Sequence, residues 1–115
     1  MRNLYLALAA ASLLFGSTPA VAGAAGFGLV NATGTNITSL SIRRFGTQAW
    51  KPLTAAPSSG VRSQVDFSDT DCAFDIQATL AGGASATWSG VNLCEVQSVT
   101  LNRNASTGAS WVDYD

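Results

Sequence analysis

Apolar and polar residues alternate along much of the chain after residue 26, with a period of two residues. Between residues 61 and 67, for example, Val61, Val65 and Phe67 alternate with Arg62 and Asp66. Successive side chains of a β-strand point to opposite faces, so this period predicts strands, and no segment keeps apolar residues at helical spacing over three turns. We expect about seven strands, at residues 27–31, 37–45, 61–67, 72–80, 85–91, 96–102 and 110–114.

The pattern is clearest between Cys72 and Cys94, where two alternating segments flank a Gly82-Gly83 turn and so predict a β-hairpin. We expect a loop of about three to five residues, because a two-residue loop would place Trp88 among polar side chains. The predicted facing pairs are Leu80 with Ala86, Ala78 with Trp88, Ile76 with Gly90, and Cys72 with Cys94. The other face, predicted to be solvated, carries Asp75, Gln77 and Thr79 against Val91, Ser89 and Thr87.

Cys72 and Cys94 are the two cysteines of the chain, and this pairing places them opposite each other at the open end of the hairpin. We therefore predict a Cys72–Cys94 disulfide. It would close a loop of about 23 residues, for which the chain-entropy model gives roughly 3 kcal/mol. The alternative is two reduced, buried cysteines, which an oxidising compartment disfavours.

Residues 1–22 have the features of a secretory signal peptide that is cleaved from the mature chain. Arg2 gives a positive start, residues 4–15 are an apolar run, and Ala20-Val21-Ala22 offers small residues to a signal peptidase. Cleavage after Ala22 is the first choice and cleavage after Ala24 the second. The apolar run is too short to span a bilayer as a mature helix. We expect an exported protein, periplasmic or extracellular, without a transmembrane segment in its mature chain.

The remaining residues, 23–115, have the length of a single domain. Short strands at this spacing, separated by turn segments at 31–34, 52–60, 68–71 and 104–108, predict an all-β fold. The expected architecture is a small antiparallel β-sandwich of about seven strands with one disulfide. A small open β-barrel is the alternative.

Charge and composition exclude several function classes. The chain carries 6 basic and 7 acidic residues and shows no basic stripe, so we expect no nucleic-acid partner. It contains no histidine, which excludes Ser-His-Asp and Cys-His arrangements and histidine-based metal sites. No Gly-rich phosphate loop is present. A carboxylate pair could support glycosidase chemistry, but a chain this small has little room for a cleft. We expect no enzyme activity and no cofactor.

Four aspartates, Asp66, Asp69, Asp71 and Asp75, crowd the turn between the third and fourth predicted strands. Calcium takes several oxygen ligands from flexible loops, so these four residues are candidate metal ligands. Their spacing does not match the calcium loop of helical sensors. The favoured interpretation is a turn whose aspartates hydrogen-bond to their own backbone, with Asp66 and Asp75 on outward strand faces and no metal bound.

Aromatic side chains give a second set of candidates. Trp50, Trp111 and Tyr114, together with Phe45, could offer a stacking surface for a glycan. Strand parity assigns Trp88 to the core. Core packing is favoured for most of these side chains, because a domain of this size needs them to fill its interior.

Several motifs resemble those of small exported, functionally uncharacterised proteobacterial proteins. They are Phe27-x-Leu29-x-Asn31-x-Thr33-Gly34, Ile37, Leu40-x-Ile42, Trp50, Leu53, Cys72-x-x-Asp75-Ile76 and Trp88-x-Gly90-Val91-Asn92-Leu93-Cys94. The resemblance covers most of the mature chain. It implies a fold and an exported location, and it implies no catalytic residue.

Two function classes remain. The first is a monomeric binding or accessory module that recognises a glycan, peptide or protein partner through loops at one end of the sandwich. The second is a subunit of a surface assembly, in which a segment such as Ala24 to Val30 adds to the sheet edge of a neighbour. A calcium- or glycan-dependent accessory domain of an enzyme is a distant third.

Overall fold

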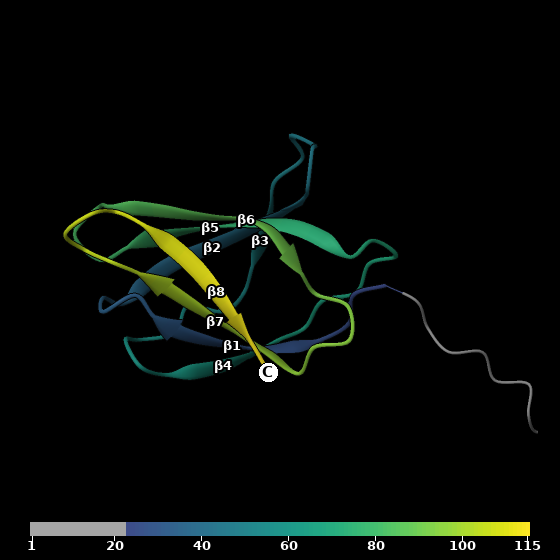
Figure 1. Ribbon diagram of the computed structural model, residues 1–115, viewed down its shortest axis with the longest axis horizontal. Coiled ribbons are helices and arrows are strands. Elements are labelled where there is room, and N and C mark those ends of the chain that lie inside the picture. The colour runs from purple at the N-terminus through teal and green to yellow at the C-terminus, as the bar shows by residue number, and fades with distance from the viewer. Residues whose placement is uncertain (1–22) are drawn as a thin grey trace, which may run out of the picture.

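The computed structural model describes residues 23–115, which form two four-stranded β-sheets packed face to face as a sandwich (Figure 1). The predicted fold class is confirmed. The predicted signal peptide, residues 1–22, lies outside the described residues. One sheet has the order β4-β1-β7-β8 and the other β3-β2-β5-β6. The strands of the described region are β1 (Phe27–Ala32), β2 (Ile37–Arg44), β3 (Lys51–Leu53), β4 (Arg62–Val65), β5 (Ala73–Leu80), β6 (Ser85–Asn92), β7 (Ser98–Arg103) and β8 (Ser110–Tyr114).

Strand β1 is central in its sheet, since it pairs antiparallel with β4 and parallel with β7. This parallel pair departs from the antiparallel arrangement that was predicted. Phe27, Gly28 and Leu29 are all buried, although neighbouring residues of a strand point to opposite faces. At Gly28 the outer face is covered by Arg62, whose Nε would lie 2.3 Å from a Cβ at that position. A glycine therefore leaves room for the arginine side chain.

The β5–β6 hairpin has a different register from the predicted one. Its loop is residues 81–83, because the Leu80 N–H donates to the Ala84 carbonyl at 2.7 Å, so the expected loop length is confirmed. Ile76 pairs with Trp88 and Ala78 with Ala86. The expected pairs of Leu80 with Ala86, Ala78 with Trp88 and Ile76 with Gly90 are therefore wrong.

The register then shifts between Phe74 and Ile76, after which Phe74 pairs with Val91. Strand β6 thus contains an extra residue, and Gly90 lies there with a positive φ of 67°. The shift carries Cys94 toward Cys72, with which it forms the predicted disulfide at a Cα–Cα distance of 5.2 Å. The predicted disulfide is therefore confirmed, although near the turn each β5 residue pairs with a β6 residue two positions before its predicted partner.

The core lies between the two sheets and is lined by alternate residues of each strand. Trp88 is 2% exposed and its Nε1 donates to the Asn102 carbonyl at 2.9 Å, so its predicted place in the core is confirmed. The other buried apolar side chains include Phe27, Leu29, Ile37, Leu40, Ile42, Val65, Phe74, Ile76, Leu80, Val91, Leu93, Val99 and Leu101.

A buried polar cluster closes the turn between β1 and β2. The Asn31 amide donates to the carbonyls of Thr35 and Pro57, while its Oδ1 accepts hydrogen bonds from the N–H and hydroxyl of Thr33. All the amide groups of this fully buried side chain are therefore satisfied, as burial of a polar group requires. The cluster ties the β3–β4 connection to the end of β1.

Two strand predictions need correction. The sequence pattern predicts a turn segment over residues 52–60, whereas Lys51–Leu53 form the short strand β3. Pro52 is compatible with this strand because β3 lies at the edge of its sheet. The alternation places Asp75 and Val91 on a solvated face, yet they are 2% and 1% exposed. Val91 follows the register shift of β6, and the contacts that bury Asp75 are described below.

We expect Trp88→Ala to lower the free energy of unfolding by about 3–5 kcal/mol, because it removes a buried indole and leaves a cavity. Chemical denaturation measures the change. Trp111→Ala is the matched control, since Trp111 is 49% exposed, and it should unfold close to wild type. If Trp88→Ala proves too unstable to purify, Trp88→Phe should give a smaller loss. Unchanged unfolding of both Trp88 variants would contradict the assignment of strand faces.

Candidate functional site

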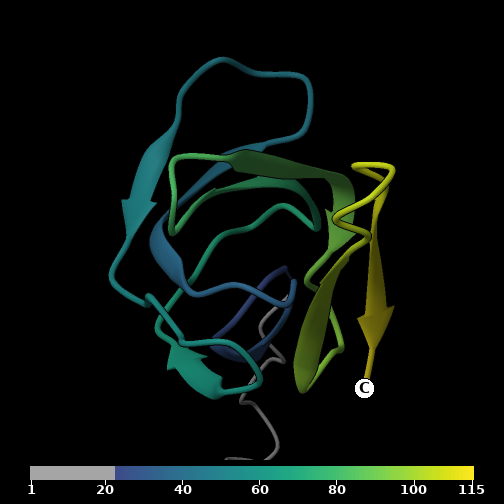
Figure 2. The same cartoon turned by 90° about the vertical axis from the view of Figure 1, so that its left-hand side faces the viewer.

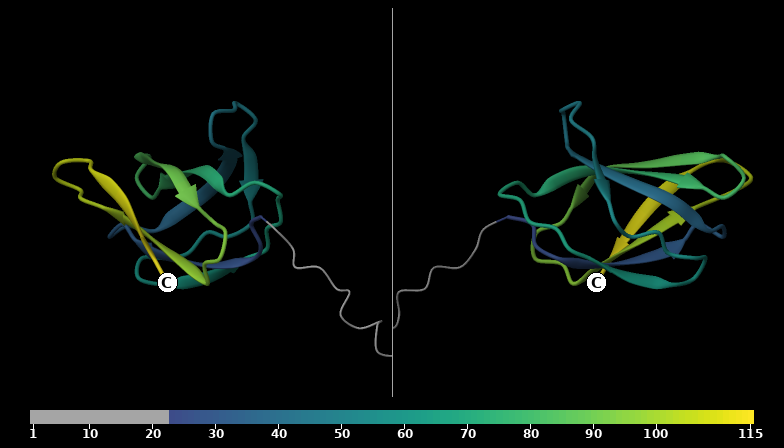
Figure 3. Two further views of the ribbon diagram at one scale, coloured as in Figure 1. Left: turned by 45° about the vertical axis from the view of Figure 1, so that its right-hand side comes forward. Right: turned by 180° about the vertical axis from the view of Figure 1, so that it is seen from behind.

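A groove with a volume of about 440 Å³ lies at one end of the sandwich. We call it the end groove. Its walls are the β2–β3 connection, residues 45–50, and the β4–β5 connection, residues 66–72. The β2–β3 connection projects well beyond the sheets (Figure 3). The lining residues are Ile42, Arg43, Arg44, Thr47, Ala49, Lys51, Phe67, Ser68, Asp69 and Phe74.

The floor of the end groove is apolar. Ile42 and Phe74 come from the core and are nearly fully buried, while Phe67 is half-buried. The Phe67 ring meets the Phe74 ring edge-on, with centroids 5.1 Å apart, and meets the Phe27 ring at 6.4 Å. Edge-to-face contacts of this kind are favourable, so Phe67 is held as an extension of the core into the groove.

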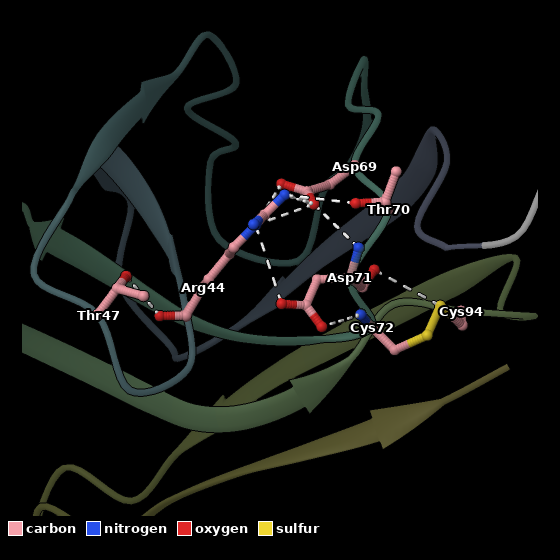
Figure 4. A network of polar contacts seen from close by, with 7 residues as sticks. All are labelled: Arg44, Thr47, Asp69, Thr70, Asp71, Cys72 and Cys94. Atoms are coloured by element: carbon pink, nitrogen blue, oxygen red, sulfur yellow. Dashed lines mark hydrogen bonds and ion pairs between the residues drawn. A yellow bond between two sulfur atoms is a disulfide. The ribbon is translucent and has the colours of Figure 1, made fainter.

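An ion pair closes one side of the end groove (Figure 4). Arg44 at the end of β2 donates from Nη2 to Asp69 Oδ1 at 2.7 Å and from Nε to the same oxygen at 3.0 Å. Asp71 Oδ2 lies 3.9 Å from Arg44 Nε. The Arg44 hydrogen bond and the Asp71 N–H lower the pKa of Asp69, so its carboxyl is ionised at neutral pH. Arg44 is well exposed, so we expect the pair to orient the groove wall more than to stabilise the fold.

The turn that carries Asp69 is anchored from two sides. Before β1, the Ala24 N–H donates to the carbonyls of Asp69 and Asp71, and the Asp69 N–H donates back to Ala24. After the turn, Cys72 is joined to Cys94 (Figure 4). Within it, Asp69 Oδ1 accepts from the Asp71 N–H at 2.9 Å, a hydrogen bond typical of an aspartate that starts a turn. The groove wall is therefore rigidly attached to both sheets.

A second ion pair lies on the outer face of the β3-β2-β5-β6 sheet and includes Arg43, which also lines the end groove. Asp75 Oδ2 accepts from Arg43 Nε at 2.8 Å, and its Oδ1 accepts from the Ser89 hydroxyl at 2.7 Å and the Gly90 N–H at 3.1 Å. The Arg43 guanidinium lies over the Trp50 ring, 4.4 Å from its centroid. Asp75 thus orients Arg43, which in turn holds Trp50 and the β2–β3 connection.

The environment of Asp75 acts on its pKa in two directions. Burial raises the pKa, while the hydrogen bonds from Ser89, Arg43 and Gly90 and the charge of Arg43 lower it. The net result is a pKa below the ordinary value, so the buried carboxylate is ionised and fully hydrogen-bonded. The prediction of a solvated Asp75 was wrong, because strand parity does not reveal what covers an outer face.

The four aspartates do not converge. Asp66 is exposed, Asp69 and Asp71 lie around Arg44, and Asp75 contacts Arg43. Across residues 23–115, no three side chains of the histidine, cysteine, aspartate and glutamate types come together so that they could hold a metal ion. The arginines that follow one another at the end of β2 separate these carboxylates.

The predicted aromatic candidates fall into two places. Trp111 and Tyr114, each 49% exposed, line a second groove between β6 and β8. Trp50 lies elsewhere, against Arg43, and Phe45 is exposed in the β2–β3 connection. Sequence reasoning missed the end-groove residues Arg44, Lys51 and Phe67, which come from separate segments. Phe67 follows Val65 by two residues, so the strand period places both side chains on the same face, and this was the available signal that Phe67 faces inward.

Comparisons with known proteins found no match: no family model, no curated protein and no solved structure is similar to this chain. Within the described part of the chain, no helix has the length and apolar character needed to cross a membrane.

The lowered pKa of Asp75 predicts a specific pH dependence of stability. Because folding lowers this pKa, the ionised carboxylate stabilises the fold above its ordinary pKa of about 4, and the contribution is lost as pH falls through the lower folded value. Asp75→Asn should therefore destabilise the protein most near neutral pH. The difference in free energy of unfolding between this variant and wild type should shrink below about pH 4.

Urea unfolding at a series of pH values measures this difference. Asp66→Asn is the control, since Asp66 is exposed and has no ion pair with a residue in the range 23–115. Its stability should follow that of wild type. Parallel curves for Asp75→Asn and wild type at all pH values would contradict the assigned role.

Proposed function

We propose that this protein is an exported, non-enzymatic binding module that takes a small ligand in the end groove. The single observation that carries the proposal is the combination, in one groove of about 440 Å³, of an apolar floor and a charged rim. Small-molecule sites in proteins are typically concave, roughly 300–1,000 Å³ in volume and mostly apolar with a few polar groups. The end groove falls within this volume range, it combines apolar side chains with a larger share of polar and charged ones, and it lies where loops from both sheets meet.

The charges of the rim indicate the kind of ligand. Arg44 is engaged by Asp69, and Arg43 by Asp75. Lys51 on β3 is exposed and forms no ion pair with another residue of the described region. A ligand with an apolar body and one negatively charged group would place the body against Phe67 and the charge near Lys51. We therefore propose a small amphipathic acid as the ligand class.

The groups in the groove favour binding over catalysis. Asp69 is its acidic residue, and the hydrogen bond from Arg44 keeps the pKa of Asp69 below its ordinary value. An efficient general acid or base has a pKa near the working pH, which Asp69 does not have. The chain also has no histidine, and both of its cysteines form the disulfide.

Assembly by strand addition is the less favoured candidate. Ala24 is buried and bridged to Asp69, and Phe27 to Val30 pair with β4. This segment, which in the assembly alternative would add to a neighbour's sheet edge, is thus used within its own domain. Donating it to another copy would require β1 to leave the centre of its sheet.

The proposal predicts saturable binding of small carboxylates to the end groove. We would titrate the purified protein with a panel of aliphatic and aromatic carboxylates and follow amide proton–nitrogen correlation spectra. Shifts should cluster at Ile42, Arg44, Lys51 and Asp69. Ala49→Trp, which fills the groove, should weaken binding at least about tenfold, which corresponds to roughly 1.4 kcal/mol. Lys51→Gln should weaken carboxylates selectively over their amides.

Ala56→Trp is the matched control, because Ala56 is exposed in the β3–β4 connection and does not line the end groove. It should bind like wild type. Absence of shifts at millimolar ligand, or equal binding by Ala49→Trp, would refute the end groove as the ligand site. Cell fractionation and mass spectrometry of the purified chain test the proposed export. Recovery only from the cytoplasm, with residues 1–22 retained, would contradict it.

A further inference from the structure

A second groove runs along the side of the sandwich, between the edge strand β6 of one sheet and the edge strand β8 of the other. We call it the seam groove; its volume is about 410 Å³. Figure 2 shows β8, in yellow, at the right-hand side of the molecule, next to green strands. Strands β6 and β8 are edges of different sheets and form no backbone ladder with each other within the described structure.

The seam groove has fixed ends. Near the start of β8, the Ser110 hydroxyl donates to the Thr87 carbonyl at 3.0 Å. At the end of β8, the Tyr114 hydroxyl accepts from the Asn92 N–H at 3.0 Å. From Ser110 to Tyr114 the strand advances about 13 Å at the usual rise per residue. Two hydrogen bonds thus hold the two sheets at a set distance, and the groove between them is preformed.

The chemistry of the lining differs from that of the end groove. Every residue that lines the seam groove in the described structure is uncharged: Thr87, Trp88, Ser89, Val91, Ser110, Trp111, Val112 and Tyr114. Trp88 is buried in the core, and the Ser89 hydroxyl is engaged by Asp75. The groups open to a ligand are therefore the exposed aromatic side chains of Trp111 and Tyr114, the Thr87 hydroxyl and the acceptor lone pairs of the Ser110 hydroxyl, whose proton is donated to the Thr87 carbonyl.

From this lining we infer that the seam groove is a binding site for a neutral saccharide, with Trp111 stacking on the apolar face of a sugar ring. Aromatic rings present a negative face to the weakly positive C–H groups of a sugar, and Trp and Tyr pair an apolar ring with a polar group. The Thr87 hydroxyl supplies a donor and an acceptor for sugar hydroxyls, and the Ser110 hydroxyl, whose proton is donated to the Thr87 carbonyl, supplies an acceptor. A charged ligand has no partner charge among these lining residues.

The dimensions favour a saccharide over a protein partner. A stable protein interface buries more than about 1,000 Å² and is centred on a broad patch, whereas the two exposed aromatics here flank one narrow groove. The site is separate from the end groove, whose lining includes neither Trp111 nor Tyr114. Its ligand and that of the end groove can therefore be tested independently.

The test uses oligosaccharides of glucose, galactose, mannose and N-acetylglucosamine as probes, with isothermal titration calorimetry and tryptophan fluorescence on the purified protein. Wild type should bind at least one of these probes saturably. Trp111→Ala should weaken that binding at least tenfold, while Trp111→Phe, which keeps an aromatic face, should retain most of it. Ser110→Ala, which removes one end bridge, should weaken it less than Trp111→Ala.

Trp50→Ala is the matched control, because Trp50 lies against Arg43 and does not line the seam groove. It should leave saccharide binding unchanged, and Trp111→Ala should leave carboxylate binding in the end groove unchanged. If Trp111→Ala were poorly folded, Trp111→Gln, which keeps a long uncharged side chain but no aromatic face, would replace it and should weaken saccharide binding to the same extent. Binding of none of the saccharides at millimolar concentration, or equal binding by wild type and a folded Trp111→Ala, would overturn the proposal.

Discussion

The register shift of the β5–β6 hairpin is the constraint on which most of the structure depends. Near the loop, Ile76 faces Trp88. If that pairing continued without a shift, Cys72 would face Asn92 and the cysteines would be too far apart along the strands to bond. The extra residue in β6 moves Cys94 to within 5.2 Å of Cys72, measured between Cα atoms. The disulfide therefore depends on a local irregularity several residues away.

The same irregularity organises the polar contacts on the outer face. Gly90, at a φ of 67°, turns its N–H toward Asp75, and Ser89 adds its hydroxyl. The buried carboxylate can then hold Arg43, and Arg43 lies over Trp50. On the other side of the shift, the disulfide fixes the turn that presents Asp69 to Arg44 (Figure 4). One wall of the end groove, the β2–β3 connection, is therefore held through Asp75 and Arg43. The other wall, the β4–β5 connection, is held by the disulfide.

The sequence was sufficient to predict the features that depend on local alternation. The sandwich, the inward face of Trp88 and the disulfide follow from apolar residues at every second position and from two cysteines at the ends of one hairpin. It was insufficient for features that depend on contacts between distant segments. Nothing in the local pattern shows that β1 lies parallel to β7, or that Pro52 belongs to an edge strand.

The candidate sites show the same division. Trp111 and Tyr114 could be selected as ligand-binding candidates because aromatic side chains near the end of the chain stand out in the sequence. Arg44 and Lys51 could not be selected, because they become part of a groove only where the β4–β5 connection lies opposite them. Asp75 was placed with the exposed aspartates, since its partners Arg43 and Ser89 are 32 and 14 residues away. Burial by such partners leaves no periodic signal.

The central claim, that one shift in the hairpin brings the cysteines together, is tested most directly by nuclear Overhauser contacts across β5 and β6 in the oxidised protein. The structure predicts contacts of Ile76 with Trp88 and of Ala78 with Ala86, followed beyond Gly90 by contacts of Phe74 with Val91 and Ala73 with Asn92. A continuous register that pairs Ala78 with Trp88 and Ile76 with Gly90 would also bring Cys72 opposite Cys94, and finding it would contradict this account.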